Sequence, residues 1–575
     1  MLKKHESYGS ILHNMAKEWK FVFFYARKYR VALFLYVLFG IVATIISLSV
    51  SIAAKYLIDA VVGKDDSALG FGVLVISLGI GQHIFQALAS YVTADLNART
   101  VVELRKEIYS RVINAKWEEI SCFHSGDLIN RLESDVNSVS NGIISFIPGV
   151  ITKLLQFIGS LIIVLYYDNT MAVLSLLSAP FLFFSSRFLI KTIRKYSQQS
   201  REINGEILSY SEESMQNILT IKAFDLTRKY IADFGRVLQT YRDVKLKYDK
   251  FSILMTLCLS LIGLIVSYIC YGWGVYRLWQ GAITFGTMTL FIQISGMLTS
   301  SFSSLASLVP SAVSIATSAG RIMEITTFDE EKDANKEKAL SIIEKSKDKG
   351  ISVKIENLSF KYKGAESETL KNVSLKINPG ETVAIIGASG EGKTTFLKLI
   401  LGIMSATQGE IEFETFDGEK IQVSDSTRRF CSYVPQGINI FSGTIRENML
   451  GVKPDATENE LYQVLELSAL SDFVKSLPLG LDTPINEQGN NFSQGQLQRI
   501  AISRALLKES MVLLMDEATS ALDSETEKAV LENIMSNRTS KTTIITTHRE
   551  SVLKYCDRVF SIDETGEFSE LIFKK

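Results

Sequence analysis

The residues with the clearest chemical potential form a glycine-rich run that ends in a lysine and a threonine. Residues 387–394 read GASGEGKT and fit the pattern G-x-x-x-x-G-K-[ST], which is typical of a phosphate-binding loop. In such a loop the glycines let the backbone wrap closely around an anion and turn its N–H groups toward it. Lys393 is then expected to reach the β- and γ-phosphates of a nucleotide, and the Thr394 hydroxyl to bind Mg²⁺. The residues predicted to surround the phosphates are Gly387, Ser389, Gly390, Gly392, Lys393, Thr394 and Thr395.

The stretches on either side of this run supply the context that the pattern requires. Residues 382–386 are apolar and β-branched, which predicts a short buried strand, and residues 395–401 have the pattern of a helix start. A strand, a glycine loop and a helix in this order argue against the alternative, which is a chance match in an ordinary turn.

Two more predicted strands end in polar residues that suit phosphoryl transfer. The apolar residues 512–515 are followed by Asp516 and Glu517. An aspartate there can hold Mg²⁺, and the adjacent glutamate can orient or deprotonate an attacking water. Residues 543–547 are followed by His548, the only histidine after residue 124. Taken alone, the two acids fit an exposed turn equally well, and an isolated histidine is usually solvated or hydrogen-bonded.

The composition limits what kind of protein could position these residues. With 575 residues the chain should hold more than one domain. Its net charge of −1 gives no global field for nucleic acid, so no nucleic-acid partner is expected. The five cysteines form no C-x-x-C pair and only five histidines occur, which gives no indication of a zinc site, a disulfide framework or a histidine-based metal centre.

The first half of the chain holds apolar stretches long enough to cross a lipid bilayer, which takes about 20 residues. Two long polar segments with a helical pattern, 96–141 and 191–250, separate some of these stretches. Buried core helices are the alternative for any one stretch, but six in succession with alternating flanking charge favour membrane spans. The predicted spans are 31–54, 71–93, 143–167, 171–190, 251–276 and 284–309.

The distribution of Lys and Arg predicts the orientation of these spans. The segments 1–30, 96–141 and 191–250 carry 25 basic residues, whereas the opposite side has only Lys55, Lys64 and Arg277. Because basic loops stay on the cytoplasmic side, we expect both termini and the phosphate loop in the cytoplasm, below a plasma or inner cell membrane.

The remaining segments complete the predicted domain organisation. Residues 1–30 are basic and aromatic, which favours a helix in the cytoplasmic interface, although an amphipathic helix packed on protein fits too. A mixed-charge run makes 326–350 a solvated linker or an exposed helix. We therefore predict an all-α domain with six spans over 31–325, followed by an α/β P-loop NTPase domain over 351–575.

One motif identifies a family. Residues 491–499 read NFSQGQLQR and resemble the signature motif of ATP-binding cassette (ABC) transporters. Phe492 and Gln494 depart from the commonest form, in which Leu and Gly stand there, whereas the serine and the second glycine are retained. The layout of the whole chain resembles an exporter-type half-transporter, with one six-span domain and one cassette.

The resemblance implies roles for further residues. Tyr362 would stack on adenine, and Gln436 would contact Mg²⁺ and sense the membrane domain. Asp523, in the sequence SALD, would couple two ATP sites, and His548 would contact the γ-phosphate. Glu487 matches an exporter-specific loop near the membrane interface. The signature residues Ser493, Gly495 and Gln496 would close over ATP bound to the opposite subunit.

The family also implies a function. Two chains would sandwich two Mg-ATP, and their closure would drive alternating access and export of a peptide, a lipid or a drug-like amphipathic molecule. The intact hydrolysis residues permit a homodimer, and a heterodimer stays open. The alternatives are an ATP-gated channel or regulator, which the intact Glu517 disfavours, and a lipid flippase or importer on the exporter fold.

Polar residues in the predicted spans suggest where cargo could bind. Gln86 and Gln293 lie in apolar stretches, where a polar side chain usually faces a cavity or another helix. We hypothesise that both line the translocation cavity; hydrogen bonding between helices is the alternative.

Overall fold

A computed structural model describes residues 8–170, 173, 179–346, 349–437, 439–486, 489, 491–537 and 541–571. The chain divides into two compact units. The first consists of Met1–Ala115 with Glu119–Asp329, and the second of Lys116–Glu118 with Glu330–Lys575.

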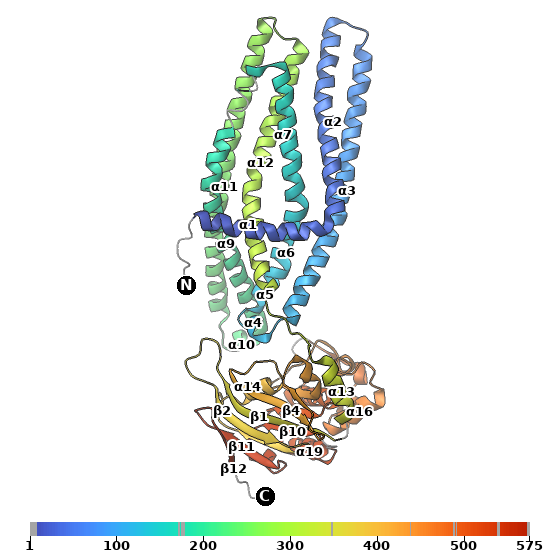
Figure 1. Ribbon diagram of the computed structural model, residues 1–575, viewed down its shortest axis with the longest axis vertical. Helices are drawn as coiled ribbons and strands as arrows, with labels where there is room; N and C mark the ends of the chain where they lie inside the picture. Colours follow the sequence, from blue (N-terminus) through green and yellow to red (C-terminus); the bar gives the residue numbers. More distant parts are fainter. Residues whose placement is uncertain are drawn as a thin grey trace. The chain divides into compact units, whose positions relative to one another are not determined.

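The described part of the first unit is helical (Figure 1). Two short π-helical segments, Arg131–Asp135 and Gly142–Phe146, connect α5, α6 and α7 into one continuous helical run. Helix α4 begins in the short segment Lys116–Glu118 of the second unit. The helices up to Thr326 are α1 (Tyr8–Ala26), α2 (Arg30–Gly63), α3 (Ala68–Asn114), α4 (Trp117–Ile120), α5 (Ser125–Asn130), α6 (Val136–Asn141), α7 (Ile147–Tyr167), α9 (Ala179–Gln216), α10 (Ile218–Ala223), α11 (Thr227–Trp279) and α12 (Phe285–Thr326).

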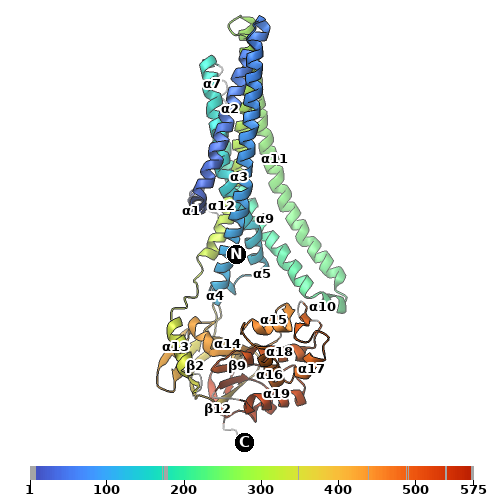
Figure 2. The same ribbon diagram turned by 90° about the vertical axis from the view of Figure 1, so that its right-hand side faces the viewer.

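Several of these helices are long and apolar enough to cross a membrane. Within the described residues there are four such helical runs, at His13–Gly63, Ala68–Asn114, Ser125–Tyr167 and Phe285–Thr326. The predicted span 251–276 lies within α11. Residues 171, 172 and 174–178 of the predicted span 171–190 lie outside the described residues, and its part from 179 to 190 belongs to α9. The polar segments 96–141 and 191–250 are mostly helical and extend the spans; α9 and α11 run side by side there, joined through α10 (Figure 2).

Helix α1 is amphipathic, and one of its faces packs on protein. Val22 and Ala26 are buried in a cluster with residues of α3, α6 and α12. Trp19 packs on Phe146 with 4.7 Å between the ring centroids. Phe24 on another face is exposed. The helix therefore combines the two possibilities that its sequence suggests, with a protein contact on one side and aromatic residues free to meet an interface on the other.

The second unit contains two main sheets (Figure 1). An antiparallel sheet has the order β2-β1-β4-β5. A larger sheet has the order β12-β11-β3-β10-β9-β6, in which all neighbours except β12 and β11 pair in parallel. The strands are β1 (Ile351–Phe360), β2 (Leu370–Ile377), β3 (Thr382–Ile386), β4 (Gln408–Thr415), β5 (Lys420–Gln422), β6 (Cys431–Val434), β9 (Val512–Asp516), β10 (Thr542–Thr546), β11 (Arg558–Ile562) and β12 (Phe568–Leu571), with β7 (Gly443–Thr444) and β8 (Pro484–Ile485) forming a small separate pair.

The parallel strands are almost wholly buried, as the apolar runs of β3, β9 and β10 predict. Their register places Thr546 opposite both Ile385 and Asp516. Because the carboxyl ends of parallel strands meet at one edge, the loops after β3, β9 and β10 converge there. The helices of this unit are α13 (Lys336–Ser346), α14 (Lys393–Ile400), α15 (Ile445–Leu450), α16 (Glu458–Leu467), α17 (Ser471–Ser476), α18 (Gln494–Leu507), α19 (Ser524–Ser536) and α20 (Glu550–Leu553).

The segment expected to be a solvated linker or an exposed helix, 326–350, requires a correction. Within it, α13 buries Ala339 and Ile342 completely in the core of the second unit. The guanidinium group of Arg428 holds Glu331 through two hydrogen bonds of 2.6 and 2.7 Å. The reason is a short apolar stripe, spaced three residues apart among the charges, which is enough to bury one face of a helix.

Candidate functional site

The glycine loop connects β3 to α14 and has the backbone conformation that its pattern requires. Gly390 and Gly392 have φ values of +94° and +102°, in the left-handed region that other residues avoid. A Cβ atom on Gly392 would also lie 3.1 Å from the carbonyl oxygen of Thr369. Helix α14 starts directly after Gly392, so its free N–H groups open toward the loop.

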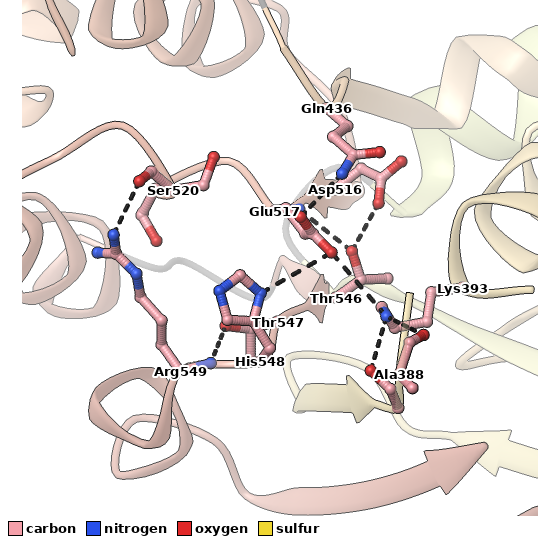
Figure 3. A network of polar contacts seen from close by, with 12 residues as sticks. Ala388, Lys393, Gln436, Asp516, Glu517, Ser520, Thr546, Thr547, His548 and Arg549 are labelled. Carbon is pink, nitrogen blue, oxygen red and sulfur yellow. Dashed lines mark hydrogen bonds and ion pairs between the residues drawn. The ribbon is translucent and has the colours of Figure 1, made fainter. Parts of the chain in front are cut away.

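Lys393 lies at the centre of this loop. Its ammonium group donates hydrogen bonds of 2.8 Å to the carbonyl oxygens of Gly387 and Ala388 (Figure 3). The side chain is almost completely buried, and its Nζ atom lies 3.9 Å from a carboxylate oxygen of Glu517. A fixed positive charge between the loop backbone and a carboxylate is well placed to hold phosphate oxygens.

Asp516 ends β9 as a buried carboxylate. One of its oxygens accepts a 2.7 Å hydrogen bond from the Thr546 hydroxyl, and the other accepts a 3.2 Å hydrogen bond from the Tyr433 phenol. Burial, together with the negative charge of Asp516, raises the pKa of Tyr433, so this phenol stays protonated and remains a donor.

Glu517 is the residue on which the site converges (Figure 3). Its carboxylate accepts a 2.8 Å hydrogen bond from the Gln436 amide, and one of its oxygens lies 3.9 Å from both Lys393 Nζ and His548 Nδ1. Its φ of +47° is in the left-handed region, and its backbone N–H donates to the Thr546 carbonyl at 3.1 Å. A glutamate held in this conformation is strained, which is common where a side chain is aimed at a reacting group.

The residue expected to stack on adenine lies next to the loop. The Tyr362 hydroxyl and the Thr395 hydroxyl are 2.9 Å apart, with Thr395 in the first turn of α14. The Tyr362 ring contacts Phe360 edge to face and is exposed to solvent over part of its surface.

The signature residues and Asp523 have structural contacts of their own. Ser493 and Gln496 form a reciprocal capping box at the start of α18, with hydrogen bonds of 2.8 and 3.2 Å. Gly495 is so close to the Ala521 carbonyl that a Cβ atom would lie 3.1 Å from it. Asp523 caps α19, and the hydrogen bond from the Thr526 backbone lowers the pKa of its carboxyl group. Glu487 lies outside the described residues.

The oxygen atoms near the loop fit a magnesium ion. The hydroxyl of Thr394, the carboxylate of Asp516 and the amide oxygen of Gln436 are hard donors of the kind that Mg²⁺ prefers. Among the residues that the structure describes, no cluster of three or more His, Cys, Asp or Glu side chains could hold a metal ion without further ligands. This suits an ion that takes part of its shell from nucleotide phosphates and water.

Three residues of this region were not predicted from the sequence. Thr546 supports both Asp516 and Glu517, Gln498 contacts the Glu517 carbonyl from α18, and Arg549 binds the loop after Glu517. Of these three, only Thr546 could have been predicted from the sequence. It is a polar residue at the end of the strand that precedes His548, and this strand end pairs in register with Asp516. The other two contacts depend on side-chain conformations across the fold.

Both halves of the chain match known protein families. Residues 33–302 match the family described as ABC transporter transmembrane region, and residues 370–520 match the family described as ABC transporter. Together the two matches cover well over half of the chain.

Individual relatives span nearly all of the chain. A protein of Rickettsia bellii named "Putative export ATP-binding/permease protein" is 28% identical over 522 residues, which cover 88% of this chain and 86% of that protein. A Staphylococcus aureus protein named "Putative multidrug export ATP-binding/permease protein" is 27% identical over 567 residues, covering 96% and 97%. The solved structure of a bacterial Atm1-family ABC exporter with ATP bound has a TM-score of 0.83 at 23% identity, covering 95% of this chain and 94% of that one.

Proposed function

Because the chain belongs to the ABC transporters, as an exporter-type half-transporter with an ABC ATPase domain, we propose that it uses ATP hydrolysis to export an amphipathic molecule from the cell. It is a multi-pass membrane protein. The observation that carries the proposal is the convergence of Lys393, Gln436 and His548 on the carboxylate of Glu517, beside a phosphate loop of the required geometry.

Each of these side chains has a part in hydrolysis. Lys393 and the N–H groups at the start of α14 hold the β- and γ-phosphates. Glu517 orients a water molecule and accepts its proton as the water oxygen attacks the γ-phosphorus, and the bond to the ADP oxygen breaks. His548 donates a hydrogen bond to a γ-phosphate oxygen. Thr394, Asp516 and Gln436 hold Mg²⁺, which when bound neutralises negative charge on the phosphates.

A second copy of the chain completes each site. Ser493, Gly495 and Gln496 form the N-terminus of α18, which suits an anion supplied from outside the subunit. All hydrolysis residues are intact, so two identical chains would form two equal sites, and we propose a homodimer. A purified single gene product that dimerises with ATP and hydrolyses it supports this; strictly monomeric, inactive protein would favour a heterodimer.

The proposed orientation of the chain follows from the charge distribution. With 25 basic residues on one side of the spans and three on the other, both termini and the ATPase domain lie in the cytoplasm. The name of the Staphylococcus aureus relative, which refers to multidrug export, supports an amphipathic or neutral cargo.

The export proposal can be tested in inside-out membrane vesicles. We expect ATP-dependent uptake of a fluorescent amphipathic dye by the wild-type protein and no uptake by Glu517→Gln. ATP-dependent ionic current without uptake would favour a channel, and movement restricted to labelled lipids between leaflets would favour a flippase.

We also propose that Gln86 and Gln293 line the cargo cavity. Both side chains are exposed in the first unit, on α3 and α12. Cysteines at these positions should react with a water-soluble thiol reagent without nucleotide and react more slowly with trapped nucleotide. Inertness in both states would assign them to helix packing.

A further inference from the structure

We propose that Arg549, the residue after His548, is a positioning residue for ATP hydrolysis. It fixes the loop from Ser520 to Asp523, and through it the backbone of Glu517, to the segment that carries His548. The inference rests on the ATPase activity proposed above. The inference extends that activity by assigning a role to a side chain outside the nucleotide-binding motifs.

The contacts of Arg549 are directed at the backbone of this loop. Its Nη2 atom donates a 2.8 Å hydrogen bond to the Ser520 carbonyl (Figure 3). Its Nη1 atom donates a 3.2 Å hydrogen bond to the Leu522 carbonyl. The same Nη1 atom lies 2.9 Å from the carboxylate of Glu527. A planar guanidinium group can satisfy these acceptors together, whereas a lysine ammonium cannot match the geometry.

Glu527 anchors the guanidinium group. Its side chain in α19 is 3% exposed, and its carboxylate also accepts 2.7 Å hydrogen bonds from the hydroxyls of Thr519 and Ser551. Thr519 precedes the loop and Ser551 follows Arg549, so one buried carboxylate links both segments. Because its acceptors are occupied by well-placed donors, this arrangement favours a single position for Arg549.

Gln498 holds the same loop from the opposite side. Its amide oxygen accepts a 2.9 Å hydrogen bond from the Ala521 N–H, and its amide nitrogen lies 3.3 Å from the Glu517 carbonyl oxygen. The loop is therefore fixed between α18, whose first residues are the signature, and the segment that carries His548. A strained Glu517 persists only if its surroundings determine its conformation, and these contacts do so.

The loop also carries Asp523, which the family resemblance associates with communication between two ATP sites. A loop that is fixed to both the signature helix and the His548 segment moves with them as a unit. Loss of Arg549 should therefore misplace the hydrolysis residues without removing a group that binds the phosphates in the ground state. The predicted signature is a lower kcat with a nearly unchanged KM for ATP.

Arg558 provides a matched control. Its side chain is 29% exposed, against 30% for Arg549, and it likewise combines a backbone carbonyl with carboxylates. It donates to the Lys376 carbonyl at 2.8 Å and pairs with Glu570 at 2.7 Å. It starts β11, at the amino end of a parallel strand and away from the edge that carries the site.

The test uses the full-length protein in lipid nanodiscs, with the variants Arg549→Met, Glu527→Gln, Arg549→Met/Glu527→Gln and Arg558→Met. Removing Arg549 alone leaves the buried Glu527 charge unpaired, which should lower the melting temperature, and Glu527→Gln should relieve this. We expect the double variant to recover the melting temperature but to keep a kcat at least about tenfold below wild type, with KM within about twofold. Arg558→Met should affect the melting temperature alone.

Hydrogen exchange of the peptide containing residues 517–523 tests the same idea without hydrolysis. Deuterium uptake should rise in Arg549→Met/Glu527→Gln and stay at the wild-type level in Arg558→Met. Recovery of kcat together with the melting temperature, or unchanged exchange, would overturn the proposal. If the wild-type protein hydrolysed no ATP, the proposed function would fail, and the exchange result would still decide whether Arg549 holds the loop.

Discussion

The two units each contain a carboxylate on which several cationic or polar groups converge, and the two arrangements differ. Asp135 in the first unit is completely buried, and it lies within 2.9 Å of Arg201, Arg321 and the Ser318 hydroxyl. Glu517 in the second unit is 16% exposed, and among the described residues it accepts one short side-chain hydrogen bond, from Gln436. Its other partners lie 3.9 Å away.

The difference separates a network that holds helices together from one that can act on a substrate. Asp135 joins the π-helical segment 131–135 to α9 and α12. Arg201 and Ser318 donate hydrogen bonds to one of its carboxylate oxygens, and Arg321 forms an ion pair with the other. Glu517 keeps oxygen lone pairs that no close donor in the described part of the chain occupies, and its backbone conformation strains it. A group that must accept a proton from water needs such unused capacity. The charge is similar in both cases, so the distance to the charged partners, 2.8–2.9 Å against 3.9 Å, distinguishes the roles.

Replacing Asp135 should therefore have the largest effect, and the effect should be on stability. Asp135→Ala leaves the mostly buried guanidinium group of Arg201 without its carboxylate and takes from Arg321 one of its two, the other being Asp127. Loss of one partner costs about 3–5 kcal/mol in comparable buried pairs. The measurement is the midpoint of the first thermal unfolding transition in detergent, with ATP binding to the second unit followed in parallel.

Glu133→Ala is the matched control for this variant. Glu133 is two residues away and forms an exposed 2.9 Å ion pair with Arg105, which should contribute less than about 1 kcal/mol. Equal melting temperatures for the two variants would mean that the Asp135 network does not hold the helices together.

Replacing Glu517 should have the opposite effects, with a large loss of ATP hydrolysis and little change in stability. Glu517→Gln keeps the shape of the side chain and an acceptor for Gln436, but it removes the group that accepts a proton from water. We expect phosphate release to slow by about a hundredfold, while ATP binding and the melting temperature stay near wild-type values. A marked loss of stability here would erase the distinction between the two carboxylates, and near-normal hydrolysis would remove Glu517 from the mechanism.

The sequence allowed much of the second unit and of its site to be predicted. The apolar runs that form β3, β9 and β10 end at the phosphate loop, at Asp516 and shortly before His548, and parallel pairing brings these ends together. The helix α13 was missed because its buried face is only a few residues wide and lies within a charged run. Because the charged residues around it hide its apolar positions, the buried face of α13 can be recognised only from the core residues that pack against it.

Contacts between distant side chains were beyond prediction for a different reason. Arg201 and Arg321 are 66 and 186 residues from Asp135, and no local pattern links them. Arg549 and Gln498 stand next to recognised motif residues, yet their roles depend on rotamers that only the assembled fold selects. Motifs therefore identify the groups that meet the substrate, and the packed structure identifies those that hold them.

The smallest expected effect, and the most discriminating test of the comparison, is at Thr546. This residue forms a short hydrogen bond to a buried carboxylate, as the partners of Asp135 do, but it lies within the Glu517 site. Its hydroxyl donates a 2.7 Å hydrogen bond to one oxygen of Asp516, and the other oxygen of Asp516 accepts a hydrogen bond from the Tyr433 phenol. Thr546→Val keeps the shape of the side chain but removes its hydrogen bond to Asp516, worth about 1 kcal/mol, so hydrolysis should slow by about fivefold. It also removes the hydroxyl as an acceptor for the Glu517 N–H, which keeps its 3.1 Å hydrogen bond to the Thr546 carbonyl. Thr546→Ser keeps the hydroxyl and should restore the rate. If Thr546→Ser were as slow as Thr546→Val, packing of the methyl group and not the hydrogen bond would position Asp516. Short hydrogen bonds to a carboxylate would then not be needed in this site. If Val lowered the melting temperature without slowing hydrolysis, the contact would be purely structural, as at Asp135, and the reactive group would be Glu517 alone.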